Sequence, residues 1–328
     1  MAHDTVHQCP YCELRFAYRP ELADHVAADH PRPVDDDLPA ATAPAGTITV
    51  PLDPAHPPTV ALPVAIALAR PTGLAVEIVA APAVGLPTAP YLAAARRRVV
   101  EAGVVAVRAV ELMGDAAAAI VAHAATGRTR LLCLSTHAWG VVGKGALGSV
   151  SDRIVRSSPV PVVLVGPAVL HPGQPIRRVL AGVDGSTLSR QAVDVAAALA
   201  GRLGARFDLA YVVRPNDPYD DAPDAALLWG EQHLQPPWDY EVVHGDDPAR
   251  TLADLAGQAG DTLVAVGTHG RTGLPLAVLG SVAVGLADQC TGPVLVLPAT
   301  AAPGAGTTGT TDMATATPRR AAPVEGEQ

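Results

Sequence analysis

The chain has 328 residues, a formal net charge of −9 and 49% hydrophobic residues, of which few are aromatic. This length suits two ordinary domains with cores packed from alanine, valine and leucine. The negative charge argues against broad nucleic-acid binding, because contact with a phosphate backbone depends on lysine and arginine. The sequence has no apolar run long enough to span a membrane, no signal peptide and only four cysteines, so we expect a cytoplasmic protein.

Residues 1–31 carry the spacing of a zinc-binding module. Cys9 and Cys12 are separated by two residues, and twelve residues then lead to His25 and four more to His30. Two cysteines and two histidines in this order can close a tetrahedral shell around one structural Zn2+. The segment resembles a C2H2 zinc finger, which implies a small ββα fold.

The expected helix of this finger is poorly suited to DNA. The positions that read bases in the family hold Tyr18, Glu21 and Asp24 here, and two carboxylates would repel phosphate. No second finger follows in the sequence. We therefore expect a structural role or the docking of a protein partner, and no nucleic-acid binding.

The middle of the chain contains two tandem copies of one sequence unit. Leu-Leu-Cys-Leu-Ser-Thr-His at 131–137 matches Leu-Val-Ala-Val-Gly-Thr-His at 263–269, and Leu-Gly-Ser-Val occurs at both 147–150 and 279–282. Both pairs share one offset, which indicates a domain duplication. The predicted organisation has a linker at 32–46, a first copy at 47–167, a joint at 168–175, a second copy at 176–298 and a disordered tail at 299–328.

Each copy reads as alternating strands and helices, which predicts an α/β fold with a doubly wound, Rossmann-like parallel sheet. For the second copy we expect strands near 178–183, 207–213, 239–243, 262–266 and 293–297, and helices near 188–202, 223–234, 248–258 and 279–290. In such sheets ligands bind at the carboxyl ends of strands where the strand order reverses. If the first and fourth strands are neighbours there, Asp184 and Gly267 face the same crevice.

A glycine-rich loop follows the fourth strand of the second copy. Its pattern is G-x2-G-x9-G-S, with glycines at Gly267, Gly270 and Gly280 and a serine at Ser281. Glycines let backbone N–H groups approach an anion, and the start of the next helix adds further donors. A plain surface turn is the alternative that the glycines alone leave open.

Together with the turn Val183-Asp184-Gly185-Ser186, this loop resembles the universal stress proteins, whose nucleotide-binding branch carries the same glycine motif. The resemblance covers both copies and implies that one ATP or related adenine nucleotide binds to the second copy. Asp184 would lie at the adenine–ribose end and Val212 would border the base. The implied phosphate-binding residues are Gly267, Gly270, Arg271, Gly280, Ser281 and Val282.

Two side chains have simpler interpretations. Asp184 is also suited to capping a turn or a helix, and His269 has no identified acid or nucleophile as a catalytic partner. We predict no catalytic residue.

The first copy departs from the motif. Ser135, Ala138 and Trp139 stand where the second copy has Gly267, Gly270 and Arg271. A Cβ obstructs close backbone approach, and the tryptophan removes a cation. We expect this copy to have lost nucleotide binding and to serve as a packing partner.

Three classes of function remain open: a nucleotide-binding stress-response regulator, a slow ATPase, and an adaptor that docks a protein partner through the finger under nucleotide control. The glycine loop has no Walker lysine, so we expect at most slow hydrolysis. Family members commonly pair through the last strand. We therefore expect 160–165 and 294–297 to pair within one chain as a pseudo-dimer, and a homodimer of whole chains stays open.

Overall fold

The chain forms two compact units, Met1–Ala43 and Pro44–Gln328. In the first unit, β1 (His7–Gln8) pairs antiparallel with β2 (Arg15–Phe16). The four predicted zinc ligands lie outside the described residues. The computed structural model describes residues 7–8, 15–16, 46–53, 60–81, 88–104, 107–136, 147–215, 222–268 and 279–301.

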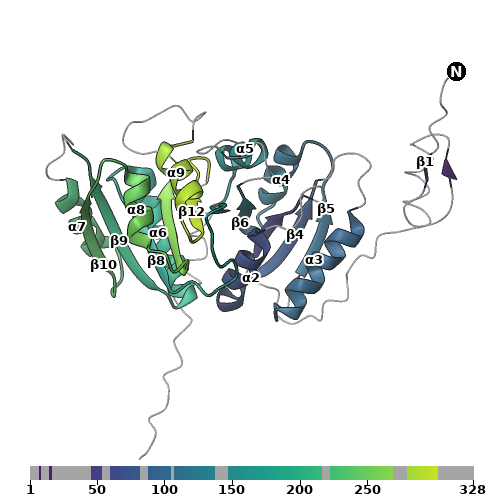
Figure 1. Ribbon diagram of the computed structural model, residues 1–328, viewed down its shortest axis with the longest axis horizontal. Helices are drawn as coiled ribbons and strands as arrows, with labels where there is room; N and C mark the ends of the chain where they lie inside the picture. The colour runs from purple at the N-terminus through teal and green to yellow at the C-terminus, as the bar shows by residue number, and fades with distance from the viewer. Residues whose placement is uncertain are drawn as a thin grey trace, which may run out of the picture. The chain divides into compact units, whose positions relative to one another are not determined.

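The second unit contains one ten-stranded sheet with helices on both faces (Figure 1). The first copy supplies β3 (Thr47–Pro51), α2 (Ala61–Thr72), β4 (Ala75–Ala80), α3 (Ala89–Glu101), β5 (Val107–Glu111), α4 (Ala116–Ala124), β6 (Thr129–Ser135), α5 (Ser149–Ser157) and β7 (Val162–Val165). The second copy supplies β8 (Arg178–Gly182), α6 (Thr187–Leu203), β9 (Arg206–Val213), α7 (Ala222–His233), β10 (Asp239–His244), α8 (Pro248–Ala256), β11 (Thr262–Gly267), α9 (Ser281–Gln289) and β12 (Val294–Leu297).

The strand order is β10-β9-β8-β11-β12-β7-β6-β3-β4-β5, so the two copies repeat one topology. Neighbouring strands within each copy are parallel. The first and fourth strands of the second copy, β8 and β11, are neighbours, with Thr262 opposite Arg178. The condition under which Asp184 and Gly267 were expected at one crevice is therefore met. Among the described residues, no helix has the length and apolar character needed to cross a membrane.

The two copies join through their last strands. β12 pairs antiparallel with β7, with Leu295 opposite Val163, so the predicted pairing within one chain is confirmed. Both strands are buried along their whole length because helices cover both faces of the sheet. One core lies under α2, α3, α6 and α7, and the other under α4, α5, α8 and α9.

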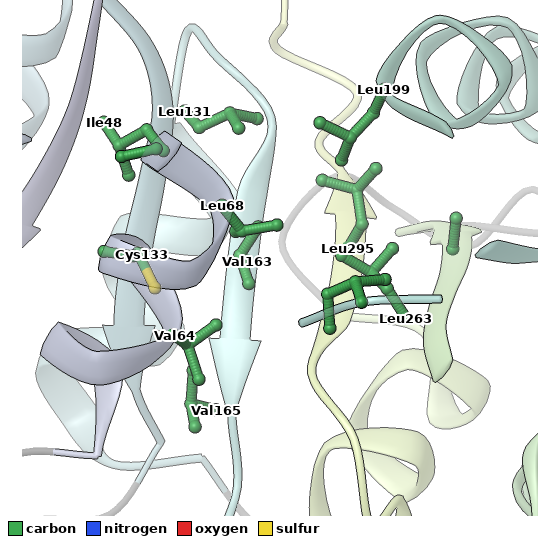
Figure 2. Packing of buried hydrophobic residues seen from close by; sticks show 14 of the residues in the cluster. Ile48, Val64, Leu68, Leu131, Cys133, Val163, Val165, Leu199, Leu263 and Leu295 are labelled. Carbon is green, nitrogen blue, oxygen red and sulfur yellow. The ribbon is translucent and has the colours of Figure 1, made fainter. Parts of the chain in front are cut away.

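Figure 2 shows the first of these cores where the copies meet. Val163 from β7 and Leu295 from β12 belong to one apolar cluster with Leu68 of α2 and Leu199 of α6. The two helices also contact each other across the boundary. The copies therefore share a continuous core as well as backbone hydrogen bonds, which is the arrangement of a pseudo-dimer.

The joint between the copies is fixed to the second copy. The Leu170 amide donates to the Thr291 carbonyl at 3.2 Å, and the Gln174 side-chain amide donates to the Ala259 carbonyl at 2.8 Å. Gly166, directly after β7, lies so close to α9 that an added Cβ would sit 1.7 Å from the Ala287 carbonyl oxygen. The joint therefore packs as part of the domain structure.

Each copy also buries one carboxylate at the same place in its second strand. In the second copy Asp208 is fully buried, and it accepts hydrogen bonds from Arg178 and, at 2.7 Å, from Arg206 Nε. In the first copy Glu77 takes this position, and its Oε2 lies 2.8 Å from His123 Nε2. A buried charge needs such partners, and the two copies meet this need with different residues.

Candidate functional site

The candidate site lies at the carboxyl ends of β8 and β11. The chain leaves β8 into a tight turn at Asp184, whose Oδ1 accepts a hydrogen bond from the Ser186 amide at 3.0 Å. Ser186 in turn caps α6, because its Oγ accepts from the Ser189 amide at 3.2 Å. Gly185 has φ +84°, a conformation that favours glycine. The half-buried Asp184 is therefore held by the turn, as its simpler interpretation requires.

One backbone hydrogen bond, between Thr268 and Gly280, holds the two ends of the glycine-rich loop together, and we call this pair of residues the neck. Gly267 is the last residue of β11, and the next residue, Thr268, accepts a hydrogen bond on its carbonyl oxygen from the Gly280 amide at 2.7 Å. Residues 269–278 lie outside the described residues, and with them the predicted site residues Gly270 and Arg271. The neck fixes both ends of the loop beside the reversal of strand order.

The start of α9 is suited to an anion. Its N-cap is Gly280, which has no side chain to accept from the first amides of the helix. The neighbouring α6 and α8 differ in this respect, since Ser186 and Asp247 cap them. Amides at an uncapped N-terminus keep their partial positive charge for another acceptor. Within the described residues, no N-cap side chain accepts from these backbone donors, which lie at the end of the loop where the resemblance implies phosphates.

The remaining predicted residues have mixed roles. Ser281 is exposed at the first position of α9, and Val282 and Val212 are half-buried and pack on the core under α8 and α9. A Cβ at Gly267 would lie 3.0 Å from Leu188 Cγ. Gly267 therefore has a packing reason to be glycine that is independent of any ligand.

Comparison with known proteins gives the family. The model of the universal stress protein family matches residues 69–166 and 175–298, which is more than half of the chain. The chain belongs to the universal stress protein family. Its two copies are tandem universal stress protein domains, as the repeated motifs predicted.

Curated relatives and solved structures agree with this membership. A universal stress protein of Mycobacterium tuberculosis H37Rv is 32% identical over 187 residues, covering 52% of this chain and 62% of the relative. Another, from M. tuberculosis CDC 1551, is 30% identical over 236 residues, covering 63% of this chain and 74% of the relative. The match to the first of these spans less than two thirds of its length.

The solved structures share the fold at low sequence identity. A putative universal stress protein of Pseudomonas aeruginosa UCBPP-PA14 has a TM-score of 0.59 at 17% identity, covering 82% of this chain and 97% of that one. One from Archaeoglobus fulgidus has a TM-score of 0.54 at 16% identity, covering 76% of this chain and 98% of that one.

The first universal stress protein domain keeps the neck but uses the motif differently. Its Gly148 amide donates to the Thr136 carbonyl at 2.8 Å, and Gly148 is the N-cap of α5. Ser135, which replaces Gly267, accepts a hydrogen bond on its Oγ from the Ala61 amide at 3.3 Å. This hydroxyl therefore contacts the start of α2, a structural role that the second domain has no counterpart for at Gly267.

One residue of the site was missed from the sequence. Thr268 is buried, with 2% of its surface exposed, and it bonds to three segments of the chain. Besides holding the neck, its amide donates to the Leu297 carbonyl at 3.0 Å and its Oγ1 accepts from the Ala299 amide at 3.2 Å. The signal was present, because Thr-His recurs at the same place in both copies.

Proposed function

We propose that the second universal stress protein domain binds one ATP or related adenine nucleotide in the crevice between β8 and β11. The observation that carries this proposal is the neck at Thr268 and Gly280, which ends on the uncapped start of α9 beside the Asp184 turn. Neutral backbone donors at a helix start suit a polyphosphate, because they supply positive potential with little desolvation cost. We further propose that the protein acts as a stress-response regulator that responds to the bound nucleotide.

Each end of the nucleotide has a chemically matched group. Asp184 can accept from ribose hydroxyls or from the amino group of the base, and Val212 offers an apolar side chain to the base. Arg271 would add a charged donor to the phosphates, together with the amides around Gly270, Ser281 and Val282. The glycine motif in the sequence supports these assignments, and the arrangement of the described strand ends is compatible with them.

The two domains provide an internal control for this proposal. Gly280 and Gly148 have nearly the same backbone, with φ −60° and ψ 141° against φ −58° and ψ 148°. Each donates its amide to the threonine at its own neck. A Cβ at Gly148 would lie 3.1 Å from the Thr136 carbonyl oxygen. Because the two glycines have nearly the same backbone angles, we expect the same substitution to strain both necks to a similar degree, so a difference in ATP affinity between the two variants reports on the ligand.

Calorimetry with ATP tests the assignment. We expect one site per chain in the unaltered protein. Gly280→Val should push at least two donors away from the phosphates, which costs about 3 kcal/mol or about a hundredfold in affinity. Gly148→Val should leave the ATP affinity within about twofold. Two equivalent sites, or full affinity in Gly280→Val, would refute the placement in the second domain. A turnover assay on the same protein separates a regulator from a slow ATPase.

A second proposal concerns the N-terminal unit, to which we assign one structural Zn2+ bound by Cys9, Cys12, His25 and His30. The complete spacing supports it, and so do the paired strands β1 and β2, between which both cysteines stand in the sequence. Such a module would dock a protein partner under the control of the nucleotide bound to the second domain. Metal analysis is the test: Cys12→Ser should remove the zinc, and undiminished zinc in this variant would exclude the assignment.

A further inference from the structure

The four residues that follow β12, 298–301, contact both domains, and we call this segment the clasp. On one side, the Ala299 amide donates to Thr268 Oγ1 at 3.2 Å in the second domain. On the other, Thr300 Oγ1 donates to the carbonyl of Ser158 at 2.7 Å in the first domain. Thr300 Oγ1 also lies 3.4 Å from the Arg156 carbonyl oxygen. Two consecutive residues thus connect the neck of the glycine loop with the end of α5.

The clasp is built on the residue that closes the neck. The Thr268 carbonyl accepts from Gly280, its amide donates to Leu297, and its hydroxyl accepts from Ala299. Because Thr268 is buried, its three bonds fix one position of its backbone and side chain together. A change in the neck must therefore either move the clasp or break one of these hydrogen bonds.

A second contact joins the two domains, this time from the first domain to α9 of the second. The chain after β7 reaches the other domain at Gly166, which lies against the carbonyl of Ala287 in α9. The chain after β12 reaches α5 through Thr300. Each last strand is thus followed by a contact with the helix that begins at the other domain's neck. The helix that carries the proposed phosphate donors, α9, is therefore held partly by the first domain.

We propose that Thr268 and Thr300 are positioning residues that couple nucleotide binding in the second domain to the docking of the first domain against it. This inference deepens the proposed function and rests on it. Neither side chain needs to touch the nucleotide. Their role is to hold the neck in the position that binds it, with the first domain as the fixed point.

The coupling must act in both directions. If docking of the first domain favours the binding geometry of the neck, bound nucleotide must favour that docking by the same factor. The net value of one neutral hydrogen bond corresponds to a change of about two- to tenfold in an equilibrium constant. This sets the size of effect that removal of the Thr300 hydroxyl should produce.

The experiment compares threonine variants by calorimetry with ATP on the full chain. Thr300→Val and Thr268→Val remove the hydroxyls and should each weaken ATP binding by about two- to tenfold. Thr300→Ser and Thr268→Ser keep the hydroxyls and should restore the affinity. Thr126→Val is the matched control, because Thr126 Oγ1 also donates to a carbonyl, that of His123, at 2.8 Å but at the far end of α4. This control should bind ATP like the unaltered protein.

Hydrogen exchange supplies a readout that a merely local role would not change. ATP should slow exchange of the backbone amides in α5 and β7 of the first domain, and Thr300→Val should abolish this protection. Unchanged ATP affinity and protection in Thr300→Val would overturn the coupling and leave the proposed function intact. An effect of Thr268→Val alone would also overturn it, since the first domain would then play no part. Failure of the unaltered chain to bind ATP would overturn both proposals.

Discussion

At Gly166, where the two domains meet, there is no room for an added Cβ atom. An alanine Cβ there would sit 1.7 Å from the Ala287 carbonyl oxygen, whereas a close carbon–oxygen contact is about 3.3 Å. The backbone at Gly166 and the backbone of α9 would have to separate by about 1.6 Å to relieve the overlap. Overpacking of this kind costs about 1 to 3 kcal/mol. We expect about 3 kcal/mol for Gly166→Ala, because both clashing groups are backbone.

Urea denaturation followed by circular dichroism measures this cost. The matched control is Gly201→Ala in α6, where no described atom beyond the chain neighbours and the backbone of its own helix lies within 4 Å of the added Cβ. Replacing a glycine within a helix should raise the unfolding free energy by up to about 1 kcal/mol. The two substitutions are chemically identical and should shift the midpoint in opposite directions. A Gly166→Ala protein as stable as the unaltered one would show that the joint does not pack against α9 as described.

Three further predictions concern buried groups. Burial raises the pKa of the Cys290 thiol to about 12 from an ordinary value of 9.0, so at pH 8 only about one thiol in ten thousand is ionised. Iodoacetamide should therefore label Cys290 and Cys133 only after unfolding, and rapid labelling of the native protein, read by mass spectrometry, would contradict this. The folded state holds the Cys290 proton more tightly, so this thiol's contribution to stability is fully present below pH 9 and is lost as the pH rises toward 12. Cys290→Ala should therefore remove this part of the fall in unfolding free energy at alkaline pH. Asp208→Asn should lower the unfolding free energy by about 3 kcal/mol, because it removes the fully buried carboxylate that pairs with both Arg178 and Arg206 and leaves Arg178 with the more exposed carboxylate of Glu241 at 3.4 Å. A loss below about 0.5 kcal/mol in urea denaturation would exclude a stabilising role for this carboxylate.

The sequence predicted the elements of the second domain closely, because apolar runs and helix starts are local signals. The helix expected at 188–202 begins at Thr187, since Ser186 caps it. The helix expected at 279–290 begins at Ser281, since Gly280 is its N-cap. The alternation of strands and helices predicted a doubly wound sheet, whereas the neighbouring of β8 and β11 was only a condition of the prediction and is given by the structure.

The candidate site was predictable only in its outline. The turn at Asp184 and the start of α9 at Gly280 lie at the strand ends that the motifs indicated. The binding roles of all the predicted site residues stay predictions. The packing of Gly267 against Leu188 was not visible, because it depends on how closely α6 approaches β11. The hydrogen bond between Thr300 and Ser158 could not be predicted from the sequence either, since it depends on the docking of two complete domains.

The first domain has a structural role even though its glycine motif is interrupted. In the sequence, Pro54 of the first domain stands where the second domain has Gly185, and proline cannot adopt the φ of +84° found at Gly185. Yet the first domain also covers the second, because β7 pairs along the outer edge of the buried strand β12. Without the first domain, β12 would be an exposed apolar edge directly beside Thr268, and such edges invite pairing with other chains. If the second domain binds nucleotide as proposed, the first domain supports that site without a ligand of its own, because it pairs with β12 and anchors the clasp.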